Sequence, residues 1–230
     1  MGESQNTLLT LLPETSRLAL PPLERVLLQP GMVLYEPEEP IDHLYFPDDA
    51  LVSIVSLGPE GRTIEIGLIG RDGMVGVPAI LGGVTPYRAV VEAGGLALRM
   101  KCVRLDDETS TNNKAFQTLL LKYTNTFLTQ VAQSSLCNCY HQLQERICRW
   151  VMVARDAVRT NTLRVTHDTL ARLLGTRRAS VTTALGLLQK AGLIRTSRGQ
   201  ITILDPDGLR RTCCECYLIL RDSIRQLQSS

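Results

Sequence analysis

The sequence predicts an α+β fold in three parts: an N-terminal antiparallel β-roll over residues 1–112, a long helix and hinge over residues 113–157, and a C-terminal winged helix-turn-helix over residues 158–230. Three observations support this division. Short β-rich runs fill the first half of the chain, an apolar pattern with helical period follows them, and the last third holds two short helical segments and a hairpin. With 230 residues, 44% of them hydrophobic, the chain can form two small domains with cores of their own.

The β-roll is predicted from five short runs of β-favouring residues separated by turn signals. The runs are residues 33–35, 44–46, 51–55, 63–66 and 89–93. Many short strands at close spacing favour an antiparallel roll or barrel over alternating strands and helices. Upstream, prolines interrupt any long helix, so the first 20 or so residues are expected to be irregular or to form short helices.

A long helix is predicted from about residue 113 to residue 140. Its apolar residues follow an alternating spacing of four and three, which is typical of a coiled-coil seam. The residues predicted to pair with a second copy of the chain are Phe116, Leu120, Tyr123, Phe127 and Val131. Leu119, Leu121 and Leu128 widen the apolar face, and a helix buried within one chain is the alternative. A second helix over residues 142–158 leads into the C-terminal module.

The C-terminal module begins with two short helices joined by a turn. Thr166 is placed to cap the first helix and Thr176 the second, and Gly175 stands in the turn, where a positive φ is easiest for glycine. Arg177 and Arg178 then fall in the opening turn of the second helix, the part that a recognition helix inserts into the major groove of DNA.

A hairpin follows the second helix and completes the winged motif. Gly192 is placed to end the helix, and residues 195–196, 197–200 and 201–203 are predicted as strand, turn and strand. A helix-turn-helix pattern alone is a weak signal, but the added wing makes the combination more specific. The module is therefore predicted to bind double-stranded DNA.

The charge distribution supports this prediction better than the overall net charge of +2. Residues 158–230 hold 12 basic against 5 acidic side chains, whereas residues 1–111 hold 8 against 16. A basic C-terminal part joined to an acidic N-terminal part is typical of a nucleic-acid surface attached to a domain with another role.

The order of these parts resembles that of the CRP/FNR superfamily of bacterial transcription regulators. The motifs that carry the resemblance are G-R-D-G-M-V-G at residues 70–76, R-R-A-S-V-T at residues 177–182 and C-E-C-Y at residues 214–217. The resemblance implies a cupin-like β-roll of the cyclic-nucleotide-binding type that responds to an effector. It also implies a dimerisation helix, a winged helix that reads a two-fold operator, and contact with RNA polymerase.

By the same resemblance, Arg178 stands where the family places an arginine that reads a guanine, and His167 and Arg198 stand where it contacts the DNA backbone. The DNA-binding residues predicted here are Thr166, His167, Arg177, Arg178, Ser180, Thr182, Thr183 and Arg198. The family often has a glutamate after the base-reading arginine, but this chain has Ala179. The operator is therefore expected to differ from that of the catabolite activator protein.

The sequence indicates an unknown effector and no cofactor, and cyclic AMP is not expected. Cyclic-nucleotide binders of the family use a glutamate for the ribose and an Arg-Ser pair for the phosphate, and the matching positions here hold Val77 and Tyr87-Arg88. Valine cannot accept a hydrogen bond from a ribose hydroxyl, so binding would leave buried hydroxyls unpaired.

Seven cysteines leave a second hypothesis open, a redox or metal sensor that uses thiols and whose output is DNA binding. Cys137-x-Cys139 on a helix directs its thiols apart, the usual zinc spacing is missing, and the three histidines are scattered, so no metal site is expected. Catalytic motifs are also absent, so no enzymatic activity is expected. With no export signal and no apolar run near the ~20 residues of a membrane helix, we expect reduced thiols and a cytoplasmic location.

Overall fold

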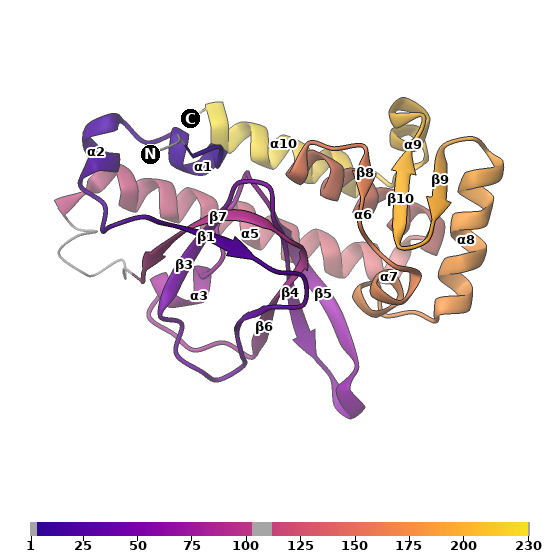
Figure 1. Cartoon of the computed structure of the whole chain (residues 1–230), viewed down its shortest axis with the longest axis horizontal. Helices are drawn as coiled ribbons and strands as arrows, with labels where there is room; N and C mark the ends of the chain where they lie inside the picture. The colour runs from indigo at the N-terminus through magenta and orange to yellow at the C-terminus, as the bar shows by residue number, and fades with distance from the viewer. Residues whose placement is uncertain (1–3, 103–111, 230) are drawn as a thin grey trace.

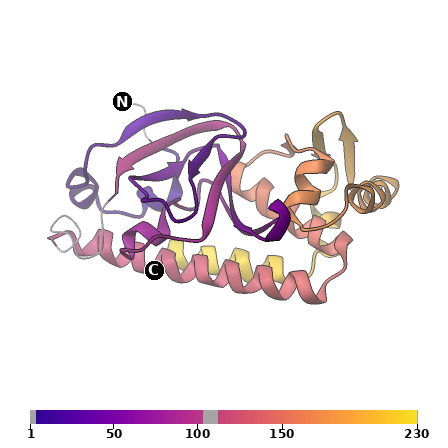
Figure 2. The same ribbon diagram turned by 90° about the horizontal axis from the view of Figure 1, so that it is seen from below.

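The computed structural model describes residues 4–102 and 112–229. Figure 1 shows the roll at one end of the molecule and the winged helix at the other, with the long helix α5 spanning both. The view from below shows the last helix, α10, lying along α5 (Figure 2). None of the helices in the described ranges is both long and apolar enough to cross a membrane.

The roll consists of two antiparallel sheets, of order β1-β7-β3 and β2-β6-β4-β5. The strands are β1 (Glu24–Leu28), β2 (Val33–Tyr35), β3 (His43–Pro47), β4 (Leu51–Leu57), β5 (Thr63–Ile69), β6 (Tyr87–Ala93) and β7 (Gly95–Lys101). The five predicted runs are confirmed as β2 to β6. The prediction missed β1 and β7, which pair with each other along their length. Both are rich in Leu, Glu, Arg, Ala or Met, residues whose weak β-propensity is overridden by packing.

Four short helical segments complete the roll: α1 (Thr7–Thr10), α2 (Glu14–Leu18), the 3₁₀ turn η1 (Pro59–Gly61) and α3 (Val77–Ile80). Asn6 attaches α1 to the strands. Its Oδ1 caps the helix by accepting from the backbone N–H of Leu9, and its Nδ2 donates to the carbonyl oxygens of Pro47 at 2.8 Å and Gly73 at 3.0 Å. The predicted short-helix lead-in is thus ordered against the roll.

Helix α5 (Lys114–Tyr140) packs directly on β5, and α6 (Leu143–Val158) turns back from its end. The contact with β5 requires a glycine, because a Cβ at Gly67 would lie 2.7 Å from Cε2 of Phe127. Gln142 and Glu145 start α6 with a capping box, in which each side chain bonds the other residue's backbone N–H.

The winged helix-turn-helix is confirmed in its elements. It contains β8 (Thr162–Leu163), α7 (His167–Leu173), α8 (Arg178–Lys190), β9 (Ile194–Ser197), β10 (Gln200–Ile203) and α9 (Pro206–Thr212). Thr166 caps α7 as predicted, by accepting from the N–H of Thr169 at 3.0 Å. The predicted cap at Thr176 is wrong: α8 begins one residue later, after Arg177, because Gly175 and Thr176 are both used in the turn that closes α7.

The last helix, α10 (Cys216–Ser229), leaves the winged helix and returns to the roll. It packs against α5, and its Leu227 belongs to the core that the roll shares with α5. A second core joins α6 to α7, α8 and the wing. Helix α10 therefore packs on α5 and α6, and its end reaches the core of the roll, although it follows the DNA-binding module in the sequence.

Candidate nucleic-acid interface

The opening turns of α8 present an exposed polar and basic face. Val181, Ala184, Leu185 and Leu188 are buried on the opposite side of the helix, and this apolar stripe fixes which side faces out. The exposed residues of the first two turns are Arg178, Ala179, Ser180, Thr182 and Thr183, preceded by Arg177 at the cap. The N-terminal end of a helix also carries a partial positive charge, which favours phosphate nearby.

Weak contacts hold the predicted DNA-binding side chains in place. Nη1 of Arg178 lies 3.3 Å from Oδ2 of Asp168, and both side chains are about two-thirds exposed, at 68% and 67%. Nδ1 of His167 lies 2.9 Å from Oγ1 of Thr182, which joins the start of α7 to α8. An exposed ion pair of this kind contributes little, so Arg178 is free to exchange its partner for a base edge.

The wing returns to the start of α7. Arg198 is exposed in the turn between β9 and β10, next to Gly199 with φ of 71°. A Cβ at Gly199 would lie 4.0 Å from Cγ2 of Thr166, so the wing tip is adjacent to the cap of α7. The fold thus brings Thr166, the first turns of α8 and the wing tip onto one module, as the sequence predicts.

An ion pair that the sequence did not reveal connects this module to the roll. Nη2 of Arg172, on α7, lies 2.9 Å from both carboxylate oxygens of Glu92, on β6. Burial raises the pKa of Glu92, and the hydrogen bond and charge of Arg172 oppose that shift. Only proximity in three dimensions reveals this contact, because the two residues are 80 positions apart.

A second link lies deeper, where β5 meets α6. Glu65 is buried, and its Oε2 accepts from Oγ of Ser53 at 2.6 Å and from Nε1 of Trp150 at 3.1 Å. Burial raises the pKa of Glu65 to about 7, although both hydrogen bonds favour the charged form. The carboxyl group of Glu65, on the roll, is therefore hydrogen-bonded to α6, the helix that leads into the winged module.

The structure corrects the residues predicted for the dimer contact. Phe116, Leu120, Tyr123 and Phe127 are buried in the chain's own core, and Val131 is half-buried beside them. They pack against the roll and are not available to a second chain. The opposite face of α5 carries an exposed stripe with the same alternating four and three spacing: Thr118, Leu121, Asn125, Leu128, Ala132 and Ser135.

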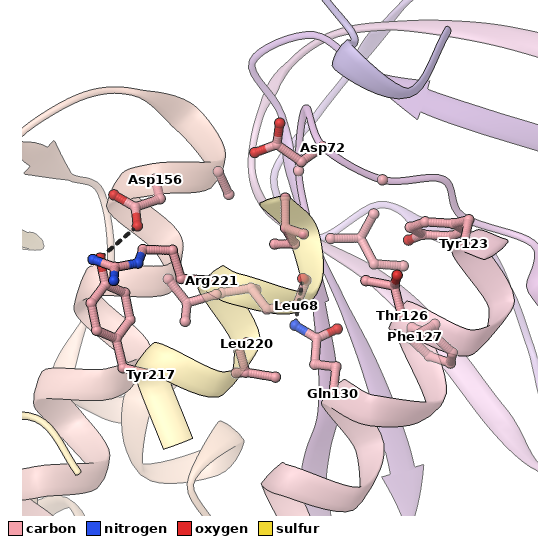
Figure 3. Close-up of a pocket in the computed structure, with 16 residues that line it drawn as sticks. Leu68, Asp72, Tyr123, Thr126, Phe127, Gln130, Asp156, Tyr217, Leu220 and Arg221 are labelled. Atoms are coloured by element: carbon pink, nitrogen blue, oxygen red, sulfur yellow. Dashed lines mark hydrogen bonds between the residues drawn. The ribbon is translucent and has the colours of Figure 1, made fainter. Parts of the chain in front are cut away.

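Val77 and Arg88, which stand at two positions that the resemblance assigns to a cyclic nucleotide, make other contacts in the structure. Val77 is buried, and Nε of Arg88 is engaged by Oε2 of Glu36 at 2.6 Å. A cavity of about 90 Å³ lies where β5, α5, α6 and α10 meet. Figure 3 shows Tyr123, Phe127 and Gln130 of α5 on one side of it and Leu220 of α10 on the other. This volume is below the roughly 300–1,000 Å³ of typical small-molecule sites.

Four side chains that could ligate a metal meet at the C-terminal end of α5. The sequence did not predict this cluster. Cys137, His141, Cys214 and Cys216 place one sulfur or ring nitrogen each within 4.8 Å of one another. The contact with Cys214 lowers the pKa of the Cys137 thiol to about 5, and a hydrogen bond to Cys137 raises the pKa of His141. Cys139 is exposed whereas Cys137 is buried, which agrees with the prediction that the two thiols are directed apart.

A β-roll connected by a long helix to a winged helix with an exposed basic recognition helix defines a class of DNA-binding transcription regulators. A model of the cyclic nucleotide-binding domain matches residues 25–107, and a model of the Crp-like helix-turn-helix domain matches residues 145–212. The chain belongs to the CRP/FNR superfamily and is a transcriptional regulator with a helix-turn-helix DNA-binding domain.

Individual relatives agree with this assignment. Transcriptional regulator SdrP of Thermus thermophilus is 25% identical over 191 residues, which cover 80% of this chain and 88% of SdrP. FixK2 from Bradyrhizobium japonicum shares the fold at 15% identity, with a TM-score of 0.70 over 84% of this chain and 98% of its own. A CRP-family transcriptional regulator from Thermus thermophilus shares it at 21% identity, with a TM-score of 0.68 over 81% and 95% of the two chains.

Proposed function

We propose that the chain is a homodimeric transcription regulator that binds a pseudo-palindromic operator. The observation that carries the proposal is the exposed start of α8, with Arg177, Arg178 and Ser180 free of the core and the wing tip beside it. Arg178 has the length and geometry to bond O6 and N7 of a guanine, and Arg198 at the wing is suited to a phosphate. Thr166, His167, Thr182 and Thr183 supply further polar contacts around them.

The way in which such a motif reads DNA supports dimerisation. One recognition helix contacts only a few base pairs, so specific binding by this motif normally uses two copies related by a two-fold axis. The exposed stripe on α5 is a surface that a second copy of the same helix fits, since two such stripes form a parallel coiled-coil seam. With α5 at the centre of the dimer, the two α8 helices would enter successive major grooves.

Control by an effector at the roll and α5 is the second part of the proposal. The ion pair between Arg172 and Glu92 and the buried Glu65 provide physical links from the roll to the DNA-binding module. We do not expect cyclic AMP as the effector, because Val77 offers no hydrogen-bond acceptor to a ribose hydroxyl. We also propose contact with RNA polymerase and a cytoplasmic location, which membership of the family supports.

Selection from random duplexes tests the proposal and requires no assumption about the operator sequence. Full-length protein should enrich a pseudo-palindrome whose half-sites are centred about one helical turn, or 10 bp, apart. Sedimentation of the enriched duplex with the protein should give two chains per duplex. Enrichment of single, asymmetric half-sites bound by one chain would contradict the dimeric reader, and no enrichment over background would contradict specific DNA binding.

A further inference from the structure

The cluster at the end of α5 joins two segments that are distant in the sequence. Cys137 lies in the last turn of α5 and His141 follows it by four residues, just beyond the helix end. Cys214 lies between α9 and α10, and Cys216 is the first residue of α10. We call these four residues the thiol-histidine cluster.

Two distances within the thiol-histidine cluster match those of a tetrahedral metal site, and all four ligand atoms lie within 4.8 Å of one another. The sulfurs of Cys137 and Cys214 are 3.6 Å apart, and the sulfur of Cys216 lies 3.6 Å from Nδ1 of His141. Around Zn²⁺, bonds of about 2.3 Å to sulfur and about 2.0 Å to nitrogen place neighbouring ligand atoms roughly 3.5 to 3.8 Å apart. A disulfide requires sulfurs about 2.05 Å apart, so the geometry fits four ligands around a common centre better than it fits a bond between two of them.

Burial makes this a closed site. Cys137, Cys214 and Cys216 are at most 6% exposed, and the side chain of His141 is 13% exposed. Three thiolates and one imidazole are a typical ligand set of structural zinc, which leaves no coordination position open for a substrate. Soft thiolate ligands select Zn²⁺ over the hard cations Mg²⁺ and Ca²⁺.

Two neighbouring residues, Glu215 and Arg149, are placed to support metal binding by the cluster. Oε1 of Glu215 lies 3.2 Å from Nε2 of His141, so Nε2–H can donate to the carboxylate and Nδ1 is left with its lone pair toward Cys216. A carboxylate that orients a ligating histidine in this way is a recurrent partner of zinc. Arg149 is buried nearby, and its Nε has no hydrogen-bond partner among the described residues. A buried cation is stabilised by the net charge of −1 that three thiolates leave on a Zn²⁺ ion.

We propose that the thiol-histidine cluster binds one Zn²⁺ ion that attaches the start of α10 to the end of α5. Each thiol that is protonated before binding releases one proton to solvent when its sulfur coordinates the metal. The ion holds α10 against α5 and fixes the connection that follows the winged helix, so the C-terminal helix and the DNA-binding module keep one relative position. The site is separate from the DNA-contacting residues.

Metal analysis of the purified full-length chain is the first test. Elemental mass spectrometry should find about one zinc per chain, and replacement by Co²⁺ should give the visible bands and the thiolate-to-cobalt charge transfer of a tetrahedral sulfur-rich site. Removal of zinc by a chelator should expose α10 to proteolysis, and added Zn²⁺ should restore its protection.

Variants distinguish the four ligands from the neighbouring thiols. Cys214→Ser and His141→Ala should lose most of the bound metal, and Glu215→Gln should weaken metal affinity by about 10- to 100-fold while keeping the stoichiometry. The matched controls are Cys139→Ser and Cys213→Ser, each within two residues of a ligand, and both should keep about one zinc per chain.

Three results on the wild-type chain would overturn the proposal even if every ligand variant failed to fold. The first is protein purified under reducing conditions that holds no zinc and gives no sulfur-to-cobalt charge transfer when Co²⁺ is added. The second is a Cys137–Cys214 disulfide, found by mass spectrometry after thiol alkylation. The third is iron with inorganic sulfide at this position.

Discussion

At the scale of single residues, we expect operator recognition to depend most on Arg178. It extends from the first turn of α8, and its one ion-pair partner among the described residues, Asp168, is itself exposed. Arg178→Ala should cost about 1 to 3 kcal/mol on the selected operator and relax discrimination at one base pair in each half-site. Fluorescence anisotropy with the operator and its single-base variants measures both effects.

Arg198 provides the matched comparison, since it is also an exposed arginine of the same module. If Arg198 contacts a phosphate, Arg198→Ala should weaken binding to all duplexes alike. The slope of log affinity against log salt should become shallower by about one. Equal loss on every duplex for Arg178→Ala would show that Arg178 contacts the backbone and does not read a base.

The raised pKa of Glu65 predicts that the unfolding free energy of the chain depends on pH. Its pKa is about 7 in the folded chain, against 4.5 for an unperturbed glutamate, so the folded state binds the proton more tightly. The stabilisation from protonation is complete below about pH 4.5 and is lost as pH rises through 7. Glu65→Gln keeps an acceptor for Ser53 and Trp150 without the charge, so it should raise the unfolding free energy at pH 8 by about 1 to 3 kcal/mol.

Urea denaturation at several pH values measures this effect. The wild type should lose stability between about pH 5 and pH 7 relative to Glu65→Gln. Glu24→Gln is the control, because Glu24 is an exposed glutamate whose pKa is lowered by Arg99, and it should leave the slope in this range unchanged. Identical slopes for the wild type and Glu65→Gln would mean that Glu65 ionises at an ordinary pH.

At the scale of elements, the two faces of α5 differ in composition and in burial. One face is sealed against the roll and α10, and the other leaves Leu121 and Leu128 exposed at 51% and 60%. Two leucines seven residues apart occupy equivalent positions of a heptad. In the proposed dimer, the same helix of a second copy would cover these two leucines.

Leu121→Glu combined with Leu128→Glu should therefore dissociate the dimer, because four like charges would face one another along the seam. Analytical ultracentrifugation should show a shift from dimer to monomer at micromolar concentration, with circular dichroism unchanged. Leu18→Glu adds a charge at another exposed leucine, at the end of α2, and should remain dimeric. A double variant that stays dimeric would place the interface elsewhere than on α5.

At the scale of the whole molecule, a cleft of about 980 Å³ separates the roll from the winged helix, and Arg172 and Glu92 line it. Their ion pair crosses the cleft, with Nη2 of Arg172 at 2.9 Å from each carboxylate oxygen of Glu92. Glu92 is 7% exposed and Arg172 39%, so removal of the arginine leaves a nearly buried carboxylate without its partner.

Arg172→Ala should thus favour opening of the module by about 1 to 3 kcal/mol, between the values for exposed and buried ion pairs. Hydrogen exchange should become faster in α7 and in β6, with the roll core unaffected. Arg88→Ala removes an ion pair within the roll and should not change exchange in α7. Unchanged protection of α7 in Arg172→Ala would mean that the apolar contacts alone hold the module to the roll.

The sequence by itself determined the order of the three parts, most strands of the roll and nearly all of the winged helix. These features depend on signals that lie close together in the chain: alternation in β2 to β6, the cap at Thr166, the turn glycine Gly175 and the hairpin after Gly192. Local propensity and periodicity act over roughly 5 to 20 residues, so such elements are readable from their own segments alone.

Only the tertiary structure decided which face of α5 is buried, where α10 packs and which side chains meet. Positions on both faces of α5 follow the alternating spacing of four and three. The spacing alone therefore does not show which face packs against the roll and which is exposed. Cys137 and Cys214 are 77 residues apart, and neither the C-x₃-H nor the C-x-C spacing is a metal motif alone. Side-chain chemistry assembled from distant segments depends on how the helices pack, because the interactions that bring those segments together are spread over the whole core.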